Sequence, residues 1–135
     1  MVAESVGVVG GRWSGVISAL PLIRTLHTAG EGELLDRVVE AMAPAAGTEL
    51  GGKAATSRLA GQGLVALREG DAVTAVELLE RAAATERALG YAFDAAALEL
   101  DLAEALHAAG EGERAAVVRR EAESFMAALA CVNPL

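Results

Sequence analysis

The chain has 135 residues, of which 53% are hydrophobic and only 3% aromatic, and its formal net charge is −8 at pH 7. This length suits a single domain, residues 1–135, with a core of its own. The acidic balance, without a cluster of Lys and Arg, argues against direct nucleic-acid binding. Cys131 is the only cysteine, which excludes an intrachain disulfide and a multi-cysteine zinc site.

The start of the chain carries neither a membrane span nor a secretory signal. The longest uncharged stretch near the start, Trp13 to Ile23, is too short to cross a bilayer. Glu4 stands where a secretory signal needs basic residues. We therefore expect a cytoplasmic protein without membrane contact.

One phrase occurs twice in the chain. Residues 26–33, LHTAGEGE, return 80 residues later as residues 106–113, LHAAGEGE, and residues 66–71, ALREGD, form a looser copy between them. Gly30, Gly70 and Gly110 thus mark a period of 40 residues, which is typical of stacked helical units. Each phrase is interpreted as the corner of a helical hairpin, because glycine can end one helix and acids favour the start of the next.

This register predicts the elements in chain order. Positions that are 40 or 80 residues apart occupy the same column, that is, the same place in the repeat. Residues 1–13 are predicted to be the remnant of a preceding repeat, since Trp13 falls in the column of Phe93. Repeat 1, about 14–43, contains a helix from Ser14 to Ala29, which Pro21 should kink or delay, and a second helix over about 33–43.

Repeat 2, about 52–89, and repeat 3, about 92–130, continue the pattern. Gly61 and Gly63 lie inside a predicted helix and indicate close packing, and Asp71 is expected to cap the helix that follows. The first helix of repeat 3 is apolar on two sides, which indicates a helix sandwiched between others. The prediction is an all-α domain of three hairpins.

Small residues recur in the last two repeats at spacings of 12 and then 7 positions: Gly63, Ala75 and Ala82, then Ala103, Ala115 and Ala122. This pattern resembles the tetratricopeptide repeat, although that repeat has about 34 residues. The turn at residues 88–91, ALGY, is followed by Ala95 and Ala96 and by residues 101–106, DLAEAL. These residues resemble the helical repeats at the C-terminus of large bacterial regulators, such as LuxR-type ATPase regulators and nucleotide cyclases. The resemblance implies an α-α superhelix, from which repeat 1 departs because Leu35 and Met42 replace two small alanines.

The resemblance also implies a function. We expect a protein-interaction or sensor module of a larger bacterial signalling or transcription regulator, which binds a partner segment or neighbouring domain in a groove lined by the first helix of each hairpin. Some of the groove positions could instead be core. The candidate groove residues are Arg24, His27, Ser57, Leu64, Arg68, Asp101, Glu104 and His107.

Two alternatives stay open. The array has no polar capping helix after Leu129, so it could instead be a module that dimerises its parent protein. Residues 47–53, GTELGGK, match a phosphate-binding loop up to the lysine, but Ala54 stands where such a loop needs Ser or Thr. A nucleotide-binding domain is therefore the weakest of the three hypotheses.

No catalytic set, cofactor site or metal site is predicted. His27 and His107 occupy equivalent columns and could form a metal pair or a pH sensor. Because they are two repeats apart, we expect them to lie two hairpin widths from one another, and copying of the repeat explains them better.

Overall fold

The computed structural model describes residues 19–42 and 52–132, and every regular element in these ranges is a helix. The prediction of an all-α protein is confirmed for this part of the chain. The expected remnant at 1–13, the start of the first predicted helix at 14–18 and the loop at 43–51 lie outside the described residues. The helices are α2 (Leu20–Thr28), α3 (Gly32–Ala41), α4 (Gly52–Arg68), α5 (Ala72–Ala88), α6 (Ala92–Ala108) and α7 (Gly112–Val132).

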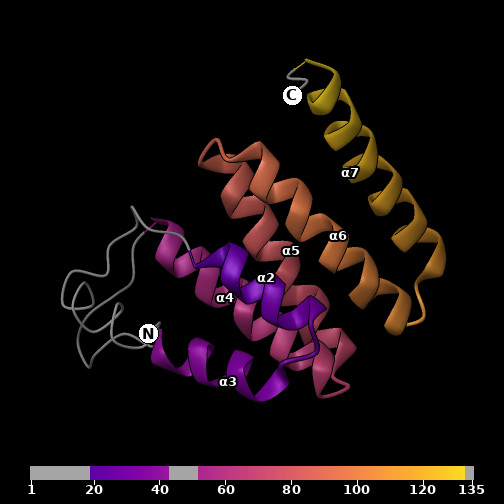
Figure 1. The fold of residues 1–135 in the computed structure, drawn as a ribbon. Coiled ribbons are helices and arrows are strands. Elements are labelled where there is room, and N and C mark those ends of the chain that lie inside the picture. Colours follow the sequence, from indigo (N-terminus) through magenta and orange to yellow (C-terminus); the bar gives the residue numbers. More distant parts are fainter. Residues whose placement is uncertain (1–18, 43–51, 133–135) are drawn as a thin grey trace.

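Consecutive helices pack side by side, and short corners follow α2, α4, α5 and α6 (Figure 1). Helix α5 packs against both α4 and α6, and α6 packs against both α5 and α7. Helix α4 also contacts both α2 and α3. The hairpins α2–α3, α4–α5 and α6–α7 therefore form a continuous stack, with α4 between the first hairpin and the rest.

The repeated phrase forms a helix corner, as predicted. After α6, Gly110 has φ of +86°, in the left-handed region that favours glycine. The N–H of Gly110 donates to the carbonyl of His107 at 3.1 Å, and the N–H of Glu111 donates to the carbonyl of Leu106 at 2.9 Å. These two bonds satisfy carbonyls that the helix end leaves without partners. The earlier copy at residues 26–31 closes α2 with the same pair of bonds.

The acids of the corners lie at helix starts. Asp71 precedes α5, and its side chain accepts a hydrogen bond from the backbone N–H of Thr74 at 3.2 Å. Glu31 precedes α3, and Glu33 and Glu113 lie in the first turns of α3 and α7. Negative charge near a helix N-terminus is favourable because the unpaired N–H groups there carry partial positive charge. These acids therefore have a structural role, as the sequence predicted.

Helix α2 begins at Leu20, so Pro21 lies in its first turn. A proline there removes no bond within the helix, because the first N–H groups have no partner to begin with. Pro21 therefore marks the start of α2 and does not kink it.

Close packing accounts for the glycines inside α4. A Cβ on Gly63 would lie 2.8 Å from Cγ of Leu79 in α5, and a Cβ on Gly61 would lie 2.5 Å from Cγ2 of Val39 in α3. Both positions are buried, and a larger side chain would displace the facing helix. Helix α4 thus meets α5 on one side and α3 on another through two positions without side chains.

The core runs through the whole stack, and α6 is buried on more than one side, as expected of a sandwiched helix. In the first hairpin, Ile23, Leu35 and Met42 take the columns of Gly63, Ala75 and Ala82 and are also buried. Larger side chains therefore fill the centre of this hairpin, which is the structural consequence of its departure from the small-residue pattern.

Candidate functional site

A bidentate ion pair joins α2, the first helix of the first hairpin, to α6, the first helix of the third hairpin. Nε of Arg24 in α2 donates to Oδ2 of Asp101 in α6 at 2.7 Å, and Nη2 donates to Oδ1 at 3.2 Å. The side chain of Asp101 is only 8% exposed and that of Arg24 is 29% exposed. The hydrogen bonds to Asp101 raise the pKa of Arg24, against the lowering effect of burial. A charge-assisted pair of this geometry is a strong contact.

A second pair lies one helical turn further along both helices. Nε2 of His27 and Oε1 of Glu104 are 3.0 Å apart, with the imidazole largely buried and the carboxylate exposed. Residues three positions apart are neighbours on a helix surface. Helix α2 therefore carries two nitrogen-bearing side chains, each of which contacts an acid on α6. Arg24 contacts Asp101, and His27 contacts Glu104.

This contact corrects the expected separation of the two histidines. His27 reaches Glu104, which stands one turn before His107 on α6. The histidines are therefore closer than two hairpin widths, because long side chains of α2 and α6 meet although the two helix backbones make no close contact. Within residues 19–42 and 52–132, no three His, Cys, Asp or Glu side chains are grouped so that they could hold a metal ion.

Arg68, at the end of α4, turns toward the first hairpin. Its Nη2 donates to Oδ2 of Asp36 in α3, and both side chains are more than a third exposed. This bond raises the pKa of Arg68. The guanidinium lies over Gly32, where an added Cβ would meet Cδ of Arg68 at 2.5 Å. Asp36 was not among the predicted residues, because a partner on the second helix of another repeat leaves no spacing signal.

Ser57 and Leu64, the two other candidates on α4, are buried. Leu64 belongs to the core cluster, and its side chain is fully enclosed. Because α4 lies between the first hairpin and the rest of the stack, these positions contact neighbouring helices in this conformation. The alternative that some groove positions are core therefore describes Ser57 and Leu64.

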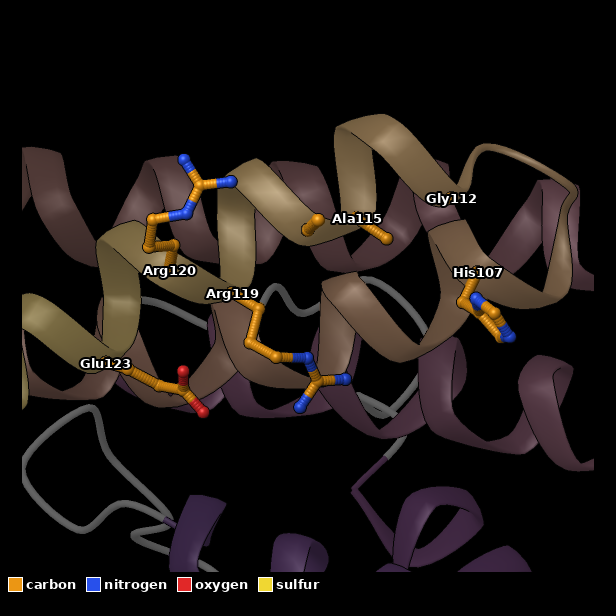
Figure 2. A pocket seen from close by; sticks show the side chains of 7 residues that line it. His107, Gly112, Ala115, Arg119, Arg120 and Glu123 are labelled. Atoms are coloured by element: carbon orange, nitrogen blue, oxygen red, sulfur yellow. The ribbon is translucent and has the colours of Figure 1, made fainter.

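His107 lies in an open pocket between α6 and α7, with a volume of about 370 Å³ (Figure 2). Most of its lining comes from α7, including Arg119 and Arg120, which the sequence analysis missed. The repeat alignment could have indicated Arg119 as unusual. Arg119 stands in the column of Val39 and Leu79, both buried apolar residues, so a charge in that column marks a change of surface.

The eight candidates thus divide into three groups. Arg24, His27, Asp101 and Glu104 are brought together between α2 and α6, Arg24 and Asp101 as an ion pair and His27 and Glu104 as a hydrogen-bonded pair. Arg68 and His107 lie at the surface, with Arg68 paired to α3 and His107 in the pocket. Ser57 and Leu64 are inside. A molecule that contacts the polar side chains of this face must therefore replace existing contacts between α2 and α6.

Two predictions concern the remaining sequence. The segment that matches a phosphate-binding loop lies mostly outside the described residues, and its last two positions, Gly52 and Lys53, begin α4. Among the helices that the structure describes, none combines the length and the apolar character that crossing a lipid bilayer requires.

No protein-family model matches this chain, and the searches of curated proteins and of solved structures found no similar protein. The tetratricopeptide resemblance therefore rests on the residues of this chain alone: the 40-residue period, the columns of small residues and the glycine corners.

Proposed function

We propose that this chain is a tetratricopeptide-like interaction or sensor module of a larger bacterial regulatory protein. It binds a protein segment, or a neighbouring domain of the same parent protein, on the face formed by α2, α4 and α6. The proposal includes an α-α superhelix and a cytoplasmic location, and it assigns no enzymatic activity and no cofactor to the chain.

The observation that carries the proposal is the pair of side-chain contacts between α2 and α6, the Arg24–Asp101 ion pair and the His27–Glu104 hydrogen bond. The Asp101 carboxylate is costly to bury, and both contacts join the first helices of two different hairpins. A partner segment with an acidic side chain can take the place of Glu104 on His27, and a basic one can take the place of His27 on Glu104. Because each lost polar contact is replaced by another, this exchange costs little and selects the partner by its pattern of acidic and basic side chains.

The test replaces His27 and Glu104 together by glutamine. The two amides can still hydrogen-bond to one another, so we expect stability to change by less than about 1 kcal/mol. The charges that a partner would exchange are gone, so the amount of partner captured from cell extract should fall by about fivefold or more. Quantitative mass spectrometry of the captured proteins measures this change.

The matched control replaces Glu77 and Arg81, one acid and one base on the exposed side of α5, by glutamine. Capture should stay at the wild-type level in this variant. Equal capture by both double variants would contradict binding on the face of α2, α4 and α6. Charge reversal at Arg24 is a poorer test, because a glutamate there would face Asp101 and lower the stability of the protein.

Self-association is the second candidate, and one feature favours it. At the corner between α5 and α6, Leu89 and Phe93 are 47% and 53% exposed. Exposed apolar side chains that gather at one place often mark a contact surface. Light scattering over a hundredfold concentration range, about 1 to 100 μM, decides the matter: a dimer that Phe93→Ser dissociates supports self-association, and a constant monomer mass removes it.

A further inference from the structure

In the first hairpin, three positions of α3 are covered by the first helix of the next hairpin. Gly32 leaves room for the side chain of Arg68, and Asp36 accepts a hydrogen bond from the same guanidinium. Cγ2 of Val39 lies 2.5 Å from the point where Gly61 would carry a Cβ. Arg68 and Gly61 both belong to α4. These α3 positions therefore form the surface on which a helix packs.

The same columns of the last hairpin line the pocket of Figure 2. Gly112, Ala116 and Arg119 stand 80 positions after Gly32, Asp36 and Val39 in the sequence. They lie on α7, and His107 of α6 completes the lining beside Gly112, at the end away from Glu123 (Figure 2). No helix among the described residues covers them. The pocket therefore occupies the place that α4 takes on the first hairpin.

The size of the lining side chains suits a helix in this place. Gly112, Ala115 and Ala116 present little or no side chain toward the pocket. Small residues let two helix backbones approach closely, as Gly61 and Gly63 do where α4 meets its neighbours. A helix is therefore a better occupant than a small molecule, for which the pocket is open and lacks an enclosed apolar wall.

This surface is basic where the equivalent surface of the first hairpin is acidic. On α3, Asp36 accepts a hydrogen bond from Arg68 of α4. On α7 the equivalent position is Ala116, and Arg119 lies one turn after it. Neither Arg119 nor His107 makes an ion pair with any residue in the described part of the chain, and the nearby Glu104 is held by His27. Glu123 is the single carboxylate of the lining, and Figure 2 shows its carboxylate apart from the guanidinium of Arg119.

We propose that the pocket between α6 and α7 is the docking site for an α-helix of a partner protein, and that this helix carries a carboxylate where α4 carries Arg68. The carboxylate pairs with Arg119 and His107, and the small residues of α7 receive the helix backbone. The inference rests on the proposed interaction role but uses a surface other than the face of α2, α4 and α6.

The test uses two synthetic peptides. The first has the sequence of α4, residues 52–68, with Arg68 replaced by glutamate, and the second keeps the arginine. We expect the glutamate peptide to bind the whole chain about tenfold more tightly than the arginine peptide. In NMR titrations it should shift the backbone amide signals of Gly112, Ala116 and Arg119. Raising the salt concentration should weaken the binding, because the charges are close to solvent.

The reciprocal variant is Arg119→Glu, an exposed position whose replacement leaves the core untouched. It should reverse the preference, so that the arginine peptide binds more tightly than the glutamate peptide. Arg81→Glu, at an exposed position of α5 away from the pocket, is the matched control and should keep the wild-type preference.

Three outcomes would overturn the inference: no shift at the α7 amides with either peptide, equal affinity for the two peptides, or a preference that Arg119→Glu leaves unchanged. A concentration-dependent dimer that Arg119→Glu dissociates would also overturn it, because the occupant would then be a second copy of the chain. The peptide titrations do not involve His27 or Glu104 as test positions. Loss of partner capture in the glutamine variant and failure of the peptide test are therefore separate results.

Discussion

Replacing Arg24 with methionine is expected to lower the free energy of unfolding by about 2 kcal/mol or more, because the carboxylate of Asp101 is left buried without its cation. Methionine preserves most of the apolar stem, so the loss reports the ion pair and not the packing. Urea unfolding followed by circular dichroism measures the change. The pair is partly open to solvent on the arginine side, which places the expected loss below that of a fully enclosed pair.

Two variants serve as controls for this prediction. Arg87→Met removes a comparable pair with Glu99 at the surface, where Arg87 is 50% exposed, and should cost less than about 1 kcal/mol. Adding Asp101→Leu to Arg24→Met should recover most of the loss, because the buried carboxylate is then gone. If Arg24→Met costs no more than Arg87→Met, the bond between α2 and α6 does not hold the first hairpin in place.

Replacing Gly63 with valine is expected to lower the free energy of unfolding by about 3 kcal/mol, since the new side chain has no room. The added Cβ alone would lie 2.8 Å from Cγ of Leu79 and 3.4 Å from Cβ of Leu78, so α4 and α5 must separate. Thermal and urea unfolding measure the loss.

Gly112→Val is the matched control for Gly63→Val. Gly112 is in the first turn of α7, and a Cβ there would have no atom within 4 Å, so we expect a change of less than about 1 kcal/mol. Equal losses in the two variants would mean that Gly63 is not needed for the close approach of α4 and α5.

The corners of this fold could be predicted from the sequence because their causes are local. A glycine with positive φ at Gly30, Gly70 and Gly110, followed by an acid at the next helix start, is a short-range pattern that the 40-residue period repeats. The burial of α6 on two sides was predicted for the same reason, since helical spacing within one element determines it.

The contacts between α2 and α6 could not be predicted in the same way. Arg24 occupies the column of Glu104 yet bonds to Asp101, one turn earlier, because α2 is displaced along α6. Such a displacement depends on how two hairpins tilt against each other, for which one sequence holds no signal. The register likewise did not separate groove from core on α4, where Ser57 and Leu64 are buried.

The most direct test of the proposed function is the binding footprint of a captured partner on the chain, measured from backbone amide shifts in NMR spectra. If the chain is an interaction module of the proposed kind, the largest shifts should fall on α2 and on the first-helix positions of the third hairpin, around Arg24, His27, Asp101 and Glu104. Shifts confined to α3 and α5, with α2 and α6 unchanged, would contradict the proposed function.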